Sequence, residues 1–366
     1  MADQSATSRD PWLDNAKMAL ILLVVVGHAW ELLPSDGPRG QLYDFLYLWH
    51  MPAFVLISGY LSRGFEYAPK RMWQLVRTLV VPYIVFEAAL ALFRLWVGGE
   101  RLQDLFTDPH FPLWYLPALV VWRLLTPLFR PLWGGVIVAA GVSVAGGFID
   151  GEMSQLMDIA RILGFLPFFV LGLKATPEML GWLRGRFPAA VGLGVLGVLW
   201  LLAGSLDHWA DVAYLYYRPY DYLEASNITV MLTRLMVVTA GMVGAVAFLT
   251  LVPRWNGWFA RMGSATLIVY LFHGFAVKGL EYAGFSDWVD GHTWLGLMAA
   301  TLSGVAITLG LAAPPVRRLL QHVVDPFGTA EKEVREAVGL AVVVQEQEEG
   351  PDEAPADAHQ GALAGR

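Results

Sequence analysis

The sequence has no cysteine among its 366 residues. Disulfide bonds, thiolate catalysis and cysteine-ligated metals are therefore excluded. Charged residues are also scarce, at 16% of the chain, compared with about 25% in soluble domains. Hydrophobic residues reach 56%, and apolar stretches of about twenty residues recur along the chain. We predict an all-α, polytopic integral membrane protein, because helices satisfy their own backbone hydrogen bonds within a lipid bilayer.

Several motifs of catalysis and binding are missing as well. The chain has no glycine-rich phosphate loop of the GxxxxGK[ST] type and no HExxH pair of histidines. It has no basic patch interleaved with aromatic residues. We therefore expect no bound metal ion and no nucleic-acid partner. Residues 1–11 carry no basic signal-peptide region, so we expect the first span to act as its own insertion signal.

Hydropathy predicts about ten membrane spans. They cover residues 15–33, 43–62, 78–97, 113–130, 133–149, 157–174, 187–205, 228–251, 263–283 and 293–313. Arginine and lysine are concentrated on alternate connections, and Arg39, Arg101 and Arg218 are the exceptions on the other side. By the positive-inside rule, both termini are then cytoplasmic.

The same pattern divides the chain into three parts. Residues 1–12 form a cytoplasmic N-terminal segment, and residues 13–318 form a transmembrane domain. Residues 319–366 form a cytoplasmic tail that is rich in acidic residues and poor in aromatic ones. A segment of this composition cannot bury enough apolar surface to fold, so we expect the tail to be disordered.

The first span combines a cation with a titratable histidine. Lys17 and His28 are eleven residues apart, which places them within about 20° on one helix face and about 16 Å apart along the axis. An imidazole at this depth is costly and usually marks a functional site. The alternative is a structural histidine that is hydrogen-bonded inside the helix bundle.

Other polar side chains also fall inside the spans. They are His50, Glu87, Arg94, Arg123, Arg161, Arg234, Tyr270 and His273. For His28, His50 and Glu87, near mid-depth, we favour a polar cavity. Arg161, and Lys278 and Glu281 in the span 263–283, are explained as buried structural pairs or as helix-end groups that reach the interface.

The connection 206–227 is the longest between the predicted spans on the outer side. It contains five tyrosines together with Trp209, Asp211, Arg218 and Asp221. Aromatic rings stack on sugar faces and carboxylates accept hydroxyl hydrogen bonds, so this composition suits a carbohydrate. An interfacial aromatic belt explains it equally well.

Several motifs in consistent order carry a resemblance to a known family. They are Asp14-Asn15-Ala16-Lys17 with His28, His50-Met51-Pro52-Ala53-Phe54 with Ser58-Gly59-Tyr60, Val81-Pro82-Tyr83, Leu113-Trp114-Tyr115-Leu116, residues 165–172, Gly263-Ser264 and Tyr270-Leu271-Phe272-His273. Over about residues 10–315 the chain resembles the membrane acyltransferases called acyltransferase family 3, and within them the fucose 4-O-acetylase-like branch.

The resemblance implies an O-acyltransferase that moves an acetyl group from cytoplasmic acetyl-CoA, or another acyl-CoA, to a hydroxyl of a sugar or glycan. His28 is then the candidate general base, since imidazole titrates near neutral pH. Glu31, one turn later, orients it or is merely interfacial. His50 binds the acceptor or donates a hydrogen bond to the oxyanion. These residues fit both direct transfer and an acetyl-histidine intermediate.

The donor coenzyme is highly anionic, so basic residues near the cytoplasm are its candidate ligands. These are Lys17, Arg71 and Arg77. The family usually has arginine where this chain has Lys17, so the charge is kept but the forked guanidinium is lost. Arg71 and Arg77 are more widely spaced than the pair of basic residues that the family has in this loop.

Four residues are candidates for the acceptor side, namely Trp114, Tyr115, Glu87 and His273. Trp114 and Tyr115 stand at the outer end of a span, where they form a sugar platform or anchor the helix at the interface. His273 is either a third wall of the polar cavity or a structural residue.

Two other function classes remain open from the residues. A secondary transporter with an intramembrane His/Glu/Arg site is the alternative, since Tyr47–His50 and Tyr270–His273 repeat one short pattern in oppositely directed spans. A catalytically silent relative that acts as a sensor is the other. The basic inner loop and the Lys17–His28 face favour the enzyme. We expect it in the plasma (inner) membrane of a bacterium, with the acceptor, acyl length and oligomeric state left open.

Overall fold

The computed structural model describes residues 10–34, 38–101, 106, 109, 112–151, 154, 156–223, 226–289 and 291–324. These residues form helices and connections with no strand among them, which confirms the all-α prediction. The chain divides into two compact units, Met1–Leu320 and Gln321–Arg366. The acidic tail that we predicted to be disordered lies outside the described residues from 325 onward.

Every predicted span coincides with a helix. These helices are α1 (Pro11–Trp30), α2 (Pro38–Leu61), α4 (Val81–Trp96), α5 (Tyr115–Phe129), α6 (Gly135–Gly146), α8 (Ile159–Lys174), α10 (Arg186–Ala203), α13 (Asn227–Leu251), α15 (Thr266–Tyr282) and α17 (Thr293–Ala312). Among the described residues, seven helical segments are long and apolar enough to cross a membrane, and α5 and α6 are shorter apolar helices. The chain is therefore a multi-pass membrane protein.

Shorter elements connect these helices. They are α3 (Pro69–Leu75), the π-helix η1 (Val76–Val80), η2 (Leu156–Asp158), α9 (Pro177–Leu183), α11 (Leu206–Trp209), α12 (Val212–Leu215), η3 (Tyr220–Tyr222), α14 (Trp258–Met262), η4 (Gly263–Ala265), α16 (Phe285–Val289) and α18 (Pro314–Val324). Helices α3, η1 and α4 follow one another without a break as a helical segment of 28 residues. A π-helical turn inside such a segment is often found at a functional site.

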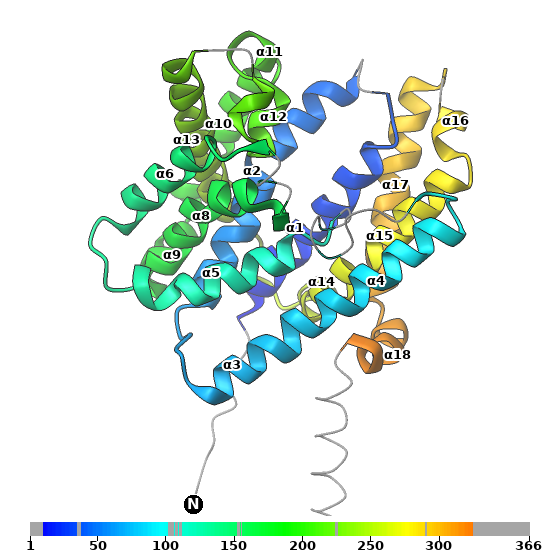
Figure 1. Ribbon diagram of the computed structural model, residues 1–366, viewed down its shortest axis with the longest axis horizontal. Helices are drawn as coiled ribbons and strands as arrows, with labels where there is room; N and C mark the ends of the chain where they lie inside the picture. Colours follow the sequence, from blue (N-terminus) through cyan, green and yellow to red (C-terminus); the bar gives the residue numbers. More distant parts are fainter. Residues whose placement is uncertain are drawn as a thin grey trace, which may run out of the picture. The chain divides into compact units, whose positions relative to one another are not determined.

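Helices α1 and α2 occupy the middle of the bundle (Figure 1). Helix α2 packs against α1, α8 and α13, while α1 packs against α17 and α15. Helix α8 also packs against α6, and α10 against α13. The first two helices therefore carry their polar residues between two groups of helices rather than toward lipid.

The close crossing of α2 and α8 depends on two glycines. A β-carbon on Gly59 would overlap the carbonyl of Phe169, and one on Gly172 would overlap the carbonyl of Leu56. Both glycines belong to motifs noted in the sequence. Small residues at helix contacts in membranes let two backbones approach closely, and this explains why both positions are glycine.

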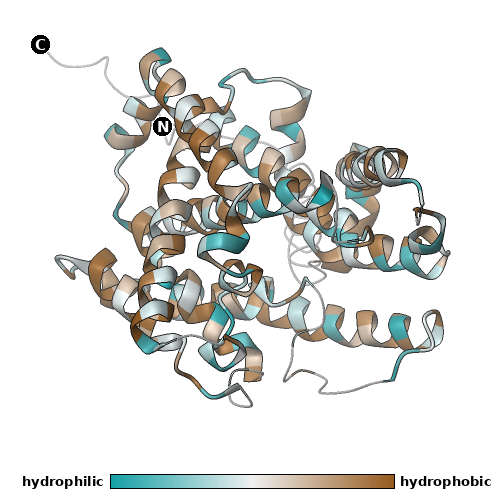
Figure 2. Ribbon diagram, turned by 90° about the horizontal axis from the view of Figure 1, so that it is seen from above, coloured by the Kyte–Doolittle hydropathy of each residue, from teal (hydrophilic) through white to brown (hydrophobic). Residues whose placement is uncertain are grey.

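The outer faces of the helices are apolar. Brown, hydrophobic residues predominate along the helices in Figure 2. Large apolar side chains such as Ile137, Leu201 and Ile228 are more than 70% exposed. In a bilayer these side chains contact lipid, which removes the cost of exposing them to water.

Candidate active site

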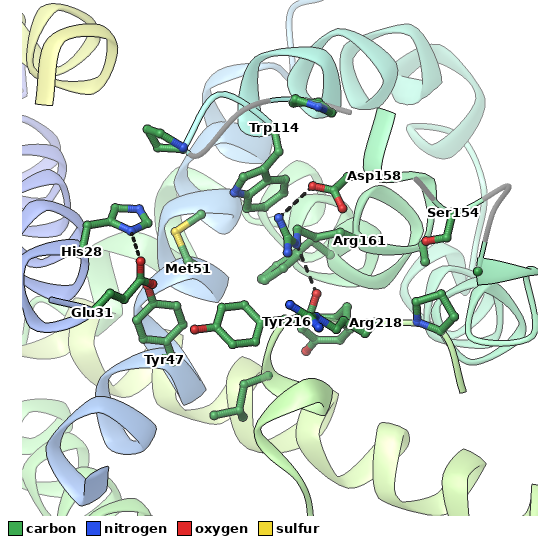
Figure 3. Close-up of a pocket in the computed structure, with 18 of the residues that line it drawn as sticks. His28, Glu31, Tyr47, Met51, Trp114, Ser154, Asp158, Arg161, Tyr216 and Arg218 are labelled. Carbon is green, nitrogen blue, oxygen red and sulfur yellow. Dashed lines mark hydrogen bonds and ion pairs between the residues drawn. The ribbon is translucent and has the colours of Figure 1, made fainter. Parts of the chain in front are cut away.

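A large cavity opens between α1, α2, α8 and the connection from α12 to α13 (Figure 3). Its volume is about 990 Å³. Its lining is rich in charged and aromatic side chains, among them His28, Glu31, His50, Trp114, Arg161 and Tyr216. We call it the polar cavity.

His28 and Glu31 form a hydrogen-bonded pair in the wall of the polar cavity (Figure 3). They lie one helical turn apart at the end of α1, with 3.2 Å between Nδ1 of His28 and Oε2 of Glu31. The other carboxylate oxygen accepts hydrogen bonds of 2.7 Å from the hydroxyls of Tyr43 and Tyr47. Because a carboxylate only accepts, Nδ1 of His28 donates and Nε2 carries the lone pair. The pair thus presents a base whose ring orientation is set by Glu31.

Two further histidines lie close to His28 with the same tautomer. Nδ1 of His50 donates to the carbonyl of Leu46 over 2.7 Å, and Nδ1 of His273 donates to that of Tyr270 over 2.7 Å. Both are buried, and the His273 ring stacks on that of His28 with 5.4 Å between centroids. Each Nε2 therefore carries a lone pair and no proton. Within the described ranges, no three histidine or carboxylate side chains gather closely enough to hold a metal ion.

A charged and aromatic cluster stands across the polar cavity from His28. The Arg161 guanidinium donates to Asp158 over 2.8 Å and to the carbonyl of Tyr216 over 3.2 Å. It also lies 5.1 Å from the centroid of the Trp114 ring (Figure 3). The hydrogen bond to Tyr216 ties α8 to the connection 206–227, and the cation–π contact ties α8 to the start of α5. A flat ring edged by charged hydrogen-bonding groups suits a sugar.

Tyr216 links this cluster to the catalytic candidates. Its hydroxyl is hydrogen-bonded to that of Tyr43, which in turn donates to Glu31. Burial raises the pKa of the Tyr216 hydroxyl to about 12, and the negative charge of Glu31 adds to this rise. The hydroxyl therefore stays protonated at neutral pH and keeps its capacity to donate.

A second cavity lies between α1, α2, α5, α15 and η1. Its volume is about 300 Å³. Leucine, isoleucine, phenylalanine and tyrosine side chains make up most of its lining, and Lys17 and Arg123 are its cations. Lys17 is paired with Asp14, with 2.6 Å between Nζ and the carboxylate. We call it the apolar cavity.

A small third space, of about 20 Å³, shares lining residues with both cavities. It shares His28, Met51 and Trp114 with the polar cavity. It shares Tyr115 and Tyr270, together with Phe54, with the apolar cavity. The three spaces therefore lie in series, and His28 lines the point where the polar part meets the apolar part. We call this point the junction.

The structure places most of the predicted site residues along this series. His28, Glu31, His50 and Trp114 line the polar cavity, and Lys17 and Tyr115 line the apolar cavity. The four predicted residues outside both linings are Arg71, Arg77, Glu87 and His273. Arg71 is exposed on α3, whereas Arg77 precedes two lining residues of η1. Glu87 is fully buried in α4, and the ring of His273 stacks on that of His28.

Sequence reasoning missed several lining residues. Arg161 and Lys278 form ion pairs with Asp158 and Glu281, as their structural interpretation expects, but both also line the polar cavity. Arg123 received no role, although a guanidinium in a predicted span was itself a signal. Tyr216 was among the five tyrosines noted in the connection 206–227, but its link to Glu31 through Tyr43 could not be predicted, because it depends on how α2 and this connection fold back.

A base at the junction of two cavities of opposite polarity suits an enzyme that transfers a group between two unlike substrates. The acyltransferase domain family matches residues 10–313 of the chain. The chain therefore belongs to this family and is a membrane-embedded acyltransferase. The enzyme prediction is confirmed over the transporter alternative.

Two curated relatives are similar over most of the chain. Both are called nodulation protein NolL. The protein from Mesorhizobium japonicum is 25% identical over 356 residues, covering 86% of this chain and 89% of the relative. The protein from Sinorhizobium fredii is 26% identical over 327 residues, covering 82% and 87%. Among solved structures, none matches the chain significantly.

Proposed function

We propose that this acyltransferase moves an acetyl group from acetyl-CoA to a hydroxyl of a sugar or glycan. The observation that carries the proposal is the His28–Glu31 pair at the junction of the two cavities. The polar cavity takes the acceptor and the apolar cavity takes the acyl arm of the donor. The two substrates then meet at His28 from opposite sides.

The apolar cavity suits the pantetheine arm of acetyl-CoA. Its walls are largely hydrocarbon, and a cation, Lys17, stands about 16 Å along α1 from His28. An extended arm spans this distance between a phosphate at one end and a thioester at the other. With both termini in the cytoplasm of a bacterial inner membrane, the Lys17 end faces the compartment that holds acetyl-CoA.

The polar cavity suits a hydroxyl-rich acceptor. Trp114 offers an aromatic ring that lies against the Arg161 guanidinium, and Tyr216 lines the same cavity. His50 has its proton on Nδ1, so its Nε2 accepts a hydrogen bond from an acceptor hydroxyl. Of the two roles predicted for His50, this tautomer favours acceptor binding over donation to an oxyanion.

The chemistry then follows from the tautomer of His28. Nε2 takes the proton of the acceptor hydroxyl while its oxygen attacks the thioester carbonyl carbon. The resulting imidazolium is stabilised by the Glu31 carboxylate across the Nδ1 hydrogen bond. When the carbon–sulfur bond breaks, the imidazolium returns the proton to the departing thiolate. Because both substrates can be present at once, the acetyl group passes directly between them.

The test is turnover of acetyl-CoA by the purified protein in nanodiscs, with a glycan-rich membrane extract as acceptor. We expect release of CoA and transfer of labelled acetyl to the glycan fraction. In the His28→Gln variant the rate should fall about 10³-fold, the range of a lost general base. Exposed His292, which lines neither cavity, supplies the matched control His292→Gln and should keep full activity.

The outcomes separate the steps of the proposal. Direct transfer predicts sequential kinetics when both substrates are varied, whereas ping-pong kinetics would indicate an acetyl-histidine. A folded His28→Gln variant with normal turnover would remove His28 from the chemistry. A wild-type protein that neither binds nor consumes acetyl-CoA with any extract would overturn the donor assignment.

A further inference from the structure

Arg123 of α5 stands out among the cations of the membrane helices. Its side chain lines the apolar cavity. Its hydrogen-bond partner is the hydroxyl of Ser62, at 3.4 Å from Nε, which is long for a hydrogen bond. Among the residues that the structure describes, no carboxylate forms an ion pair with Arg123.

Four other cations in these helices have carboxylate partners. Lys17 pairs with Asp14, Arg161 with Asp158, and Lys278 with Glu281, each within 2.8 Å. Arg94 likewise pairs with Glu100, and Arg234 donates to a backbone carbonyl and faces two tyrosine rings. A guanidinium beside hydrocarbon walls without a counter-charge is costly, so such a residue usually serves a ligand.

The position of Arg123 identifies the part of the ligand that it meets. Tyr115 lines the junction, and Arg123 lies eight residues further along α5, or about 12 Å. Lys17 lies about 16 Å from His28 along α1. The two cations thus stand near the same end of the apolar cavity, opposite the junction.

This inference rests on the proposed donor. We propose that Arg123, with Lys17, binds a phosphate group of the acyl-CoA. A guanidinium matches two phosphate oxygens at once, whereas an ammonium acts as a point charge. Arg123 therefore supplies, from α5, the forked donor that the chain lacks at Lys17. The same contact fixes how far the acyl arm reaches toward His28.

Two acetyl donors separate phosphate binding from a structural role. Acetyl-CoA carries the phosphates, and S-acetyl-pantetheine has the same thioester and arm without them. For Arg123→Gln we expect kcat/KM with acetyl-CoA to fall about 30-fold, as for a lost charge-assisted hydrogen bond. With S-acetyl-pantetheine it should stay within about twofold. For Arg123→Lys, which keeps the charge, kcat/KM with acetyl-CoA should fall less.

Arg130 provides the matched control on the same helix end. It pairs with Glu66 and lines neither cavity, so Arg130→Gln should leave both donors unaffected. Equal losses with both donors for Arg123→Gln, or no loss with acetyl-CoA, would overturn this inference alone. If Arg123→Gln fails to fold, equal changes of kcat/KM with both donors in Arg123→Lys would overturn the inference. No turnover by the wild type with either donor would overturn the proposed function as well.

Discussion

The two cavities that meet at His28 differ in size, polarity and the origin of their walls. The polar cavity, about 990 Å³, is lined by charged and aromatic groups from helices and from connections far apart in the chain. The apolar cavity, about 300 Å³, is lined mainly by hydrocarbon from helices, with Lys17 and Arg123 as its cations. His28 lines both the polar cavity and the junction.

This difference teaches how one bundle can hold two unlike substrates. Hydroxyl groups of a sugar exchange hydrogen bonds with water for equivalent ones in a polar cavity, at little net cost. An acyl arm instead gains from leaving water along apolar walls. Donor and acceptor affinity should therefore change independently.

After His28→Gln, the largest loss of activity is expected for a substitution of Glu31. Glu31→Gln removes the charge that stabilises the imidazolium, so kcat should fall about 100-fold with either substrate varied. The matched control is Glu281→Gln, since Glu281 forms an ion pair of the same helical spacing with Lys278. Steady-state rates against both substrates check this. A loss confined to the KM of one substrate would assign Glu31 to one cavity instead.

A smaller effect separates the acceptor side from the donor side. Trp114→Ala removes the ring that supports Arg161, so the KM of the acceptor should rise about tenfold, as for a lost aromatic contact. The KM of acetyl-CoA should change little, although Trp114 also lines the junction. Trp288→Ala, at a residue that lines neither cavity, is the control. A matching rise in the donor KM would contradict separate cavities.

The smallest effect concerns the rim of the polar cavity. Glu100 accepts hydrogen bonds from Arg94 and from the hydroxyl of Tyr282. Burial works to raise the pKa of Glu100, but these hydrogen bonds outweigh it and hold the pKa below the ordinary value of 4.5. The pKa of Glu100 is lower in the folded protein than in the unfolded chain. Ionised Glu100 therefore stabilises the fold fully above the unfolded pKa, and this stabilisation is lost as the pH falls through the folded pKa.

Thermal unfolding in detergent checks this expectation. At pH 7, Glu100→Gln should lower Tm by about 2 °C or less, since the group is partly exposed. The difference from wild type should shrink as the pH falls below 4.5. Glu66→Gln, which breaks an exposed pair with Arg130, should change Tm less. A Tm difference that is constant with pH would show that the carboxylate charge is irrelevant.

Much of the fold could be predicted because hydropathy and helical spacing are local properties. The predicted spans coincide with helices. The contact between His28 and Glu31 also follows from their i, i+3 spacing, since such side chains are neighbours on a helix. The role of His28 remains a proposal, but its surroundings on α1 were readable in advance.

The rest of the candidate site could not be predicted. Tyr216 reaches Tyr43 only because the connection 206–227 folds back over α2, and Arg161 meets Trp114 only because α8 packs beside the start of α5. Arg71 and Arg77 lie outside the lining of the apolar cavity, whereas Arg123 belongs to it. A one-dimensional pattern states which residues are polar and does not state which of them converge.

By itself, the sequence determined that this protein is an all-α membrane protein, where its spans lie, and which face of the first span carries Lys17 and His28. Those properties follow from burial in lipid and from a fixed rotation per residue. Only the tertiary structure decided that His28 stands between two cavities and that Arg123 shares one of them with Lys17. Those arrangements depend on close helix crossings such as that at Gly59 and Gly172, where packing between distant segments sets every distance.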